Sequence, residues 1–283
     1  TPWGTRHVCA VIAQAFCSSR KIPDMTTPTI ASADFIAGMA KGMAVLESFD
    51  TERQRLNATL AAERAGITRA AARRHLLTLA HLGYLESDGS YFWLSPKVLR
   101  FSGSYLASAR LPRSVQPTLS RLAAQTLLPF SVVVLEGPQV VIVARSTAHA
   151  EGERILAYGL HLGSRLPAHA TSTGRVLLAA LPKEELREWL RTHSLPRLTA
   201  YTQTEAPTLR KTLTQVRADD YCVASEEHEI GVHALAVPLR DLQGRTVAAL
   251  NVVTSPQRLQ AAQLENDLLP VLRDAARELR PLL

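Results

Sequence analysis

"TRAAARRHLLTLAHLGYL", residues Thr68 to Leu85, joins a basic half that carries three arginines and no acid to a half with leucines at helical spacing. This pattern predicts one helix with a charged side and an apolar side. Thr68 is a suitable N-cap and Gly83 a suitable stop. We expect the buried side to consist of Ala72, Leu76, Leu79 and Leu82. The arginines then face away from the core, where they are available to a charged partner.

A second, shorter helix is predicted immediately before this one. In "NATLAAERAG", Asn57 is a suitable cap and Gly66 a suitable left-handed stop, and a three-residue turn leads on to Thr68. After the basic helix, "YLESDGSYFWLSP" predicts strand, tight turn at Asp88-Gly89, and strand. This order is typical of a winged helix-turn-helix, whose second helix contacts bases. The expected DNA-binding residues are Asn57, Thr68, Arg69, Ala71, Arg73 and Arg74. A solvated basic surface is the alternative reading of the arginines.

Another amphipathic helix is predicted upstream, over residues 35–49, "FIAGMAKGMAVLESF". Its apolar stripe comprises Ile36, Met39, Met43 and Leu46, which are spaced three and four apart. Asp34 is the expected N-cap. The helix therefore extends the predicted DNA-binding domain toward the N-terminus.

Composition sets the broad class of the protein. A chain of 283 residues with 46% hydrophobic and 20% charged residues favours a globular protein of two domains. The net charge of +7 favours an anionic partner. Three scattered cysteines indicate a reducing compartment, so we expect a cytoplasmic protein, and no apolar run is long enough for a membrane span. Residues 1–32 are expected to be a disordered or non-native leader. Within it, we expect the residues before Met25 to be an upstream extension that lies outside the fold.

The second half of the chain mixes strands and helices irregularly. Pro112 and Pro117 are expected to break the helix that begins at Ser95-Pro96, which places a domain junction there. Strands are predicted over residues 131–137, 139–146, 154–160, 221–227, 233–241 and 246–254. Helices are predicted over residues 172–193, with a break near Pro182, and over 208–220 and 259–279. This alternation favours an α+β fold with a central sheet.

Enzyme signatures are weak in this sequence. "HEIGVH", residues 228–233, resembles a zinc-protease motif, but its histidines are five apart and do not share one helical face. No nucleophile elbow, phosphate loop or dinucleotide fingerprint is present. We therefore expect no catalytic residue, cofactor or metal, with a metal held by His161 and His169 as a remote alternative.

Four motifs together resemble the IclR family of transcriptional regulators: "FIAGMAKGMAVLESF", "TRAAARRHLLTLAHLGYL", "GSRLPAHATSTGRVLLA" and "SEEHEIGVHALAVPLRD". The resemblance runs from about Phe35 to the C-terminus and is closest to the branch that senses protocatechuate or 4-hydroxybenzoate and controls the β-ketoadipate pathway. It implies a winged helix, a linker helix, a GAF-like effector domain, and dimers or tetramers. The expected boundaries are 33–95 for the DNA-binding domain, 96–112 for the linker and 113–283 for the effector domain.

The resemblance also implies where an effector binds. The family's pocket positions correspond to Ala224, Ser225, Val232, Ala234, Asn251 and Val253. Glyoxylate-sensing members carry an acid and a cysteine where Ala224 and Ala234 stand, and the loss of these polar groups favours a flatter, more apolar ligand such as a benzoate. The expected partners of its carboxylate are Arg145, His169, Thr171 and Thr173, the last three near a helix start with free N–H groups.

These patterns predict a homo-oligomeric regulator that binds double-stranded operator DNA and senses a small aromatic acid. The expected mechanism is a population shift, in which the effector favours one arrangement of the two recognition helices. The alternative is a GAF-like small-molecule sensor or hydrolase without specific DNA binding.

Overall fold

The computed structural model describes residues 30–50, 53–146, 160–259 and 263–283. The chain divides into two compact units, which we call the winged unit, ending at Tyr105, and the sheet unit, beginning at Leu106. This division falls inside the segment predicted as the linker. The expected leader before Met25 and most of the predicted strand over residues 154–160 lie outside the described residues.

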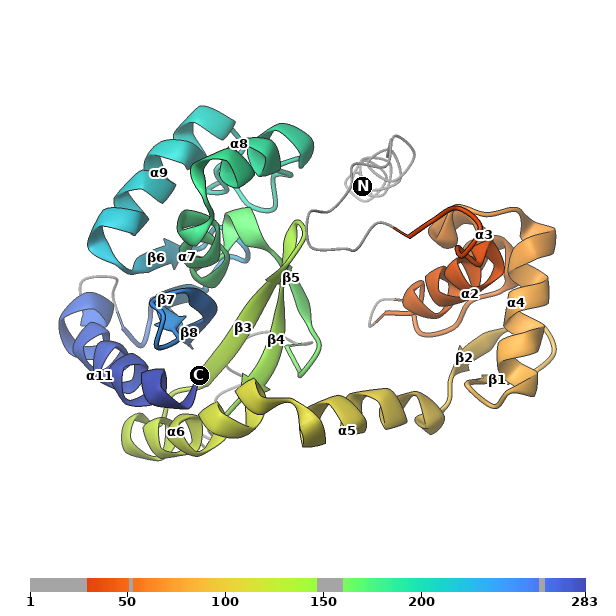
Figure 1. Cartoon of the computed structure of the whole chain (residues 1–283), viewed down its shortest axis with the longest axis horizontal. Helices are drawn as coiled ribbons and strands as arrows, with labels where there is room; N and C mark the ends of the chain where they lie inside the picture. Colours follow the sequence, from red (N-terminus) through yellow and green to blue (C-terminus); the bar gives the residue numbers. More distant parts are fainter. Residues whose placement is uncertain (1–29, 51–52, 147–159, 260–262) are drawn as a thin grey trace, which may run out of the picture. The chain divides into compact units, whose positions relative to one another are not determined.

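In the described residues of the winged unit up to Leu94, three helices pack with a two-stranded antiparallel hairpin (Figure 1). The helices are α2 (Ala37–Glu47), α3 (Ala58–Ala65) and α4 (Arg69–His81), and the strands are β1 (Leu85–Ser87) and β2 (Phe92–Leu94). Asn57, Gly66 and Thr68 occupy the predicted cap and stop positions. The core joins residues from all five elements, including Val45, Ala61, Leu76, Leu85 and Phe92. The predicted winged helix-turn-helix is therefore confirmed.

Several details of this unit differ from the prediction. Asp34 does not cap α2, because its N–H closes a turn onto Ala31 and the helix begins only at Ala37. The apolar stripe of α2 is largely exposed, with Met39 at 66%, and the helix packs inward through Val45 instead. Leu82 is 50% exposed because α4 ends at His81 and the chain turns away at Gly83.

The segment after the wing is helical for longer than predicted. A 3-10 turn η1 (Pro96–Val98) leads into α5 (Leu99–Ser108), and α6 (Arg110–Thr126) follows after a single extended residue, Ala109. The expectation that Pro112 and Pro117 break the helix is wrong. Pro112 lies in the first turn of α6, where no intrahelical N–H is required. Pro117 is accommodated within a helix whose inner side packs into the core.

Within its described residues, the sheet unit has a sheet of six antiparallel strands in the order β5-β4-β3-β8-β7-β6 (Figure 1). The strands are β3 (Phe130–Glu136), β4 (Gln139–Arg145), β5 (Arg165–Pro167), β6 (Cys222–Ser225), β7 (His233–Arg240) and β8 (Thr246–Thr254). The predicted α+β class is confirmed, and β3 with β4 forms the predicted hairpin.

Helices cover both faces of this sheet. On one face lie α6 and α11 (Leu269–Leu279), preceded by a π-helical turn η3 (Leu264–Leu268) and followed by a 3-10 turn η4 (Arg280–Leu282). The other face carries a 3-10 turn η2 (Ala168–Ala170), α7 (Ser172–Ala180), α8 (Lys183–Thr192) and α9 (Ala206–Asp219). The C-terminal helix therefore begins later than Leu259, the predicted start. Since α7 lies between the sheet and the outer helices, its residues from Ser172 to Ala179 are all buried.

Candidate functional site

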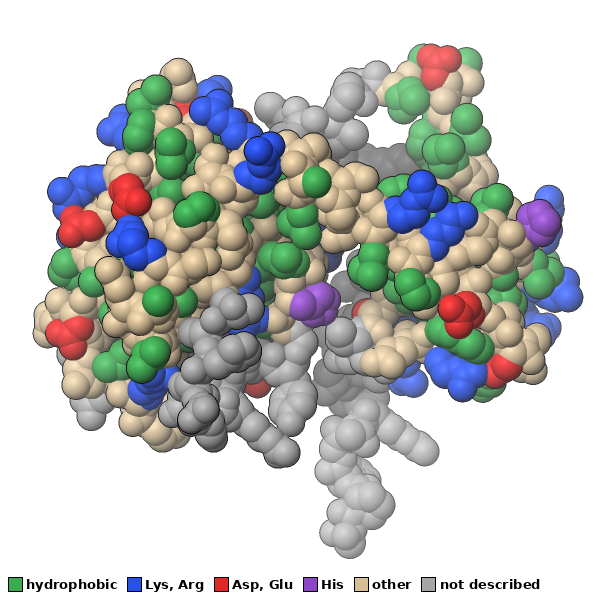
Figure 2. Space-filling view, turned by 90° about the horizontal axis from the view of Figure 1, so that it is seen from below, with side chains coloured by type: hydrophobic (Ala, Val, Ile, Leu, Met, Phe, Trp, Pro, Cys, Tyr) green, Lys and Arg blue, Asp and Glu red, His purple; other side chains and the backbone are tan. Residues whose placement is uncertain are grey.

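The basic side of α4 is a candidate nucleic-acid surface. Arg69, Arg73 and Arg74 are exposed, and none of them forms an ion pair with another described residue. Basic side chains reach the surface of the winged unit at several places in Figure 2. Guanidinium groups without acidic partners are suited to bind phosphates and the major-groove edge of guanine.

The helix caps hold this surface in position. Asn57 Oδ1 accepts hydrogen bonds from the N–H groups of Thr59 and Leu60, both at 3.0 Å. Thr68 Oγ1 accepts from the N–H of Ala71 at 3.3 Å, at the start of the basic helix. The structure thus shows Asn57 and Thr68 as helix caps. The DNA contacts expected of Asn57, Thr68 and Ala71 stay predictions.

The wing has an ordered tip. Asp88 Oδ1 accepts hydrogen bonds from the N–H groups of Tyr91 at 2.8 Å and Ser90 at 3.0 Å, and these bonds lower the pKa of the carboxyl below its ordinary value. Arg55 pairs with Asp88 and lies 4.5 Å from the ring centre of Trp93. The wing is thus tied to the chain that precedes α3.

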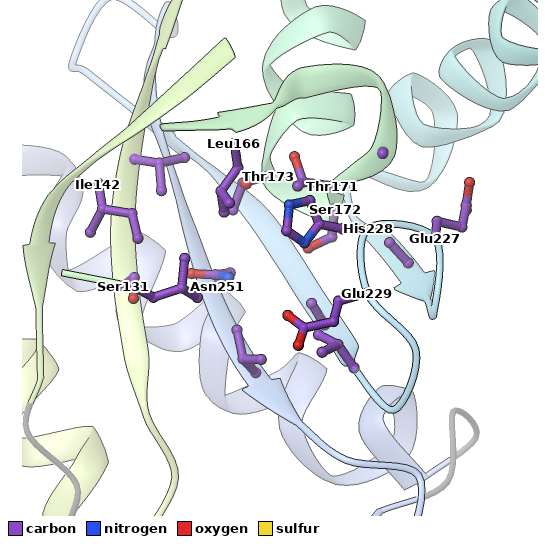
Figure 3. A pocket seen from close by; sticks show the side chains of 17 residues that line it. Ser131, Ile142, Leu166, Thr171, Ser172, Thr173, Glu227, His228, Glu229 and Asn251 are labelled. Carbon is purple, nitrogen blue, oxygen red and sulfur yellow. The ribbon is translucent and has the colours of Figure 1, made fainter. Parts of the chain in front are cut away.

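A cavity of about 670 Å³, including its open mouth, lies on the α7 face of the sheet (Figure 3). Its walls come from strands β3 to β8, the start of α7, and the loop between β6 and β7. The apolar part is formed by Val133, Ile142, Leu160, Leu166, Ala170, Ala224, Val232, Ala234 and Val253. The polar part is formed by Ser131, Thr171, Ser172, Thr173, Glu227, His228, Glu229 and Asn251.

Two polar atoms in this cavity are buried without a hydrogen-bond partner among the described residues: Ser172 Oγ and Asn251 Oδ1. Ser172 is 1% exposed and Asn251 is 8% exposed. An unsatisfied buried polar group costs about 1–3 kcal/mol, so a ligand that satisfies both groups gains from the contact. Ser172 is also the first residue of α7, where the N–H groups of Ser172 and Thr173 have no intrahelical acceptor.

The structure brings most of the predicted effector residues together. Thr171, Thr173, Ala224, Val232, Ala234, Asn251 and Val253 all line the cavity. Arg145, His169 and Ser225 do not line it. Ser225 belongs to the opposite face of β6, because successive strand residues alternate and Ala224 faces the cavity.

The two other residues outside the cavity have partners in the fold. Arg145 donates to the carbonyl oxygen of Leu160, and burial lowers the pKa of its guanidinium. His169 is buried, and its Nε2 lies 3.1 Å from the carbonyl oxygen of Pro196. Burial lowers the pKa of its imidazole as well. His169 therefore packs within the fold, in the turn η2 that precedes α7.

The cavity also contains residues absent from the sequence-based site. Ser131 lies directly across from Asn251 in the β3–β8 pairing. The sequence pattern that could have identified Ser131 is a serine in an otherwise apolar strand. His228 and Glu229 stood between two predicted strands, and Glu227 was predicted as the last residue of the first strand. Strand β6 ends at Ser225, so all three residues lie in the β6–β7 loop. Proximity in the fold, rather than any local motif, makes these residues part of the site.

A buried ion pair fixes the β6–β7 loop to α7. Arg175 Nη1 donates to Glu227 Oε1 at 2.5 Å, Arg175 Nη2 donates to Glu227 Oε2, and Arg175 Nε donates to the carbonyl oxygen of His169 at 2.9 Å. The two side chains are 2% and 11% exposed. The hydroxyl of Thr202 donates to the carbonyl oxygen of Glu227 at 2.7 Å. This network holds the residues that follow Glu227 against the cavity.

Gly174 allows η2 to approach α7 closely. A Cβ at this position would overlap the backbone of Ala168. We expect Gly174→Ala to destabilise the protein by about 1–3 kcal/mol and to weaken ligand binding at the start of α7. Chemical unfolding is the measurement, with Gly103→Ala as control because its Cβ would meet nothing within 4 Å. A Gly174→Ala protein as stable as the wild type would contradict this packing.

Neither a metal site nor a membrane span is found in the described segments. No three histidine, cysteine, aspartate or glutamate residues there are placed to hold a metal ion together. None of the helices in the described parts of the chain has the length and apolar character needed to cross a bilayer. Cys222 is a free, buried thiol whose pKa is raised to about 12 by burial.

Two family models match the chain. Residues 38–89 match the IclR helix-turn-helix domain, and residues 103–280 match the C-terminal domain of the bacterial transcriptional regulator IclR. Two curated relatives from Acinetobacter baylyi are similar along most of their length. The Pca operon regulatory protein is 55% identical, over 88% of this chain and 90% of its own. The p-hydroxybenzoate hydroxylase transcriptional activator is 54% identical, over 89% of this chain and 94% of its own.

A solved structure resembles the sheet unit. It is a double mutant of the inducer-binding domain of the PobR transcription factor from Acinetobacter, in complex with 3-hydroxybenzoic acid. It is 50% identical, with a TM-score of 0.58, and the match covers 61% of this chain and 98% of that domain.

Proposed function

The chain belongs to the IclR family of bacterial transcriptional regulators, and on this premise we propose that a small aromatic carboxylate in the cavity controls its binding to operator DNA. Protocatechuate and 4-hydroxybenzoate are the proposed effectors, and genes of aromatic-acid catabolism are the proposed targets. The observation that carries this proposal is the apolar cavity with two buried, unsatisfied polar groups, Ser172 Oγ and Asn251 Oδ1.

The chemistry of the cavity supports an aromatic acid. We place the benzoate ring among the apolar residues Val133, Ile142, Leu166 and Val253, where burial of apolar area contributes about 25 cal/mol per Å². The start of α7 offers the Ser172 hydroxyl, two backbone N–H groups and the positive end of the helix dipole to the carboxylate. Asn251 and Ser131 lie on facing positions of two strands, where they can bind a ring hydroxyl.

The relatives support the same ligand class. The Pca operon regulator and the p-hydroxybenzoate hydroxylase activator share more than half of their aligned residues with this chain. The PobR inducer-binding domain was crystallised with a hydroxybenzoic acid. We propose that the residues of the present cavity bind a similar molecule.

DNA binding is assigned to the basic side of α4 with the wing beside it. We propose that Arg69, Arg73 and Arg74 contact the operator and that the protein acts as a homodimer or homotetramer. The exposed apolar residues Met39 and Met43 of α2, together with its N-cap residue Ile36, support association with a second copy. The effector would then shift the population between two arrangements of the paired recognition helices.

The ring position can be tested by filling it. We expect Ala234→Phe to abolish binding of 4-hydroxybenzoate and protocatechuate, because the added ring occupies the space beside Val232 and Val253. Calorimetry on the full chain measures this loss. Leu242→Phe, in the exposed turn between β7 and β8, is the matched control and should bind as the wild type does. Wild-type affinity in the Ala234→Phe protein would show that the ligand does not bind in this cavity.

The alternative function is a small-molecule sensor or hydrolase without specific DNA binding. A gel shift with the DNA that flanks the chain's own gene separates the two. Specific retardation supports the regulator, and retardation no stronger than with unrelated DNA supports the alternative.

A further inference from the structure

The described walls of the cavity contain no lysine or arginine. Their ionisable side chains are Glu227, His228 and Glu229. The carboxylate of Glu227 is already neutralised by Arg175. Arg145 is not among the lining residues, and its guanidinium donates to the carbonyl oxygen of Leu160. A carboxylate that enters this space would lose its hydration without meeting a permanent positive side chain, which carries a large penalty unless another partner is present.

His228 is placed to be that partner. Its imidazole lies beside Ser172 and Thr171 at the start of α7, on the side of the cavity where the Ser172 hydroxyl is unsatisfied (Figure 3). Neither ring nitrogen has a hydrogen-bond partner among the described residues. The ring therefore has donor capacity available to a ligand.

The charge on His228 depends on what surrounds it. Burial lowers the pKa of its imidazole below the ordinary value, and Glu229 on the same loop partly opposes this effect. Three further groups face this region: Arg175 of α7, its partner Glu227 of the β6–β7 loop, and the buried His169 of η2. Arg175 and Glu227 largely cancel, and burial lowers the pKa of His169, which favours its neutral form. Burial thus favours the neutral form of His228 near pH 7, and an anion bound beside the imidazole would favour the charged form.

We propose that His228 supplies the positive partner of the effector carboxylate and takes up one proton from solvent when the anion binds beside Ser172. This inference rests on the proposed function, because it needs an aromatic acid in the cavity. It adds a titrating residue to the site, whereas Ser172 and the α7 amides bind the carboxylate at any pH.

The sign of the pH dependence follows from this coupling. Because the ligand raises the pKa of His228, affinity is highest below the pKa of the empty protein. Affinity then falls, by at most about tenfold per pH unit, as the pH rises toward the pKa of the complex. Benzoate carboxyl groups ionise well below this range, so the ligand itself contributes no matching change.

The test is calorimetry of the full chain with 4-hydroxybenzoate between about pH 5.5 and about pH 8.5, where a histidine titrates. Near pH 7, the heats in buffers of different ionisation enthalpy report proton uptake directly in the wild type. We expect uptake of a fraction of one proton and an affinity that falls with pH. His228→Gln keeps a donor but cannot titrate, so its affinity should be weaker and independent of pH.

His161→Gln is the matched control, because His161 is exposed and outside the lining, and it should keep the wild-type slope. A wild-type affinity that is independent of pH, with no proton uptake, would overturn the proposal and favour Arg145 as the partner. A His228→Gln protein that retains the wild-type slope would also overturn it. If the wild type binds no hydroxybenzoate at any pH, the proposed function is wrong, and so is the role of His228 that rests on it.

Discussion

Arg175→Met is expected to destabilise the protein by about 3–5 kcal/mol, because it leaves the carboxylate of Glu227 buried without its partner. The lost contacts include both guanidinium bonds to Glu227 and the bond from Nε to the carbonyl oxygen of His169. The β6–β7 loop would lose its attachment to α7. Effector binding should therefore weaken in any protein that remains folded.

Chemical unfolding followed by circular dichroism measures this effect. Adding Glu227→Leu to Arg175→Met should restore most of the stability, because an apolar pair of similar volume avoids the unpaired buried charge. Arg121→Met removes one partner of the exposed Arg121–Glu278 pair and should have only a small effect. An Arg175→Met protein that unfolds at the wild-type denaturant concentration would show that this ion pair does not stabilise the fold.

Replacement of both Arg69 and Arg73 by alanine is expected to abolish specific operator binding. The two residues are four apart on the exposed side of α4. Each specific base contact contributes about 1–3 kcal/mol, which is about 5-fold to about 150-fold in affinity. Neither side chain belongs to the core of the winged unit, so stability should not change.

Binding is measured by fluorescence anisotropy at one fixed salt concentration, since phosphate contacts make affinity strongly dependent on salt. Arg187→Ala removes a positive charge from the exposed side of α8 and should bind DNA as the wild type does. Effector affinity should be unchanged in all of these variants. Wild-type affinity in the double variant would show that another surface contacts the operator.

The winged helix could be predicted from sequence because its signals are local. Asn57 and Thr68 cap the helices that follow them, and Gly66 adopts the left-handed conformation that ends α3. The burial of α2 could not be predicted in the same way. Its apolar spacing specifies a stripe, but Met39 and Met43 are exposed in a single chain.

The cavity was predicted in part, because some of its features depend on contacts distant in sequence. Strand alternation would have placed Ser225 on the face opposite Ala224, but the family alignment alone does not specify faces. The Arg175–Glu227 pair joins residues that no local motif connects. Whether Ser172 Oγ has a partner depends on the packing of α7 against the sheet and the β6–β7 loop, which only the three-dimensional structure gives.

Control of operator binding by an aromatic acid is tested by measuring how the full chain binds DNA that flanks its own gene, with and without candidate effectors. We expect specific binding whose affinity or protected length changes with protocatechuate or 4-hydroxybenzoate. We expect no comparable change with glyoxylate or pyruvate, which lack a ring to fill the apolar part of the cavity. Specific binding that responds to a small keto acid and to neither hydroxybenzoate would contradict control by an aromatic acid.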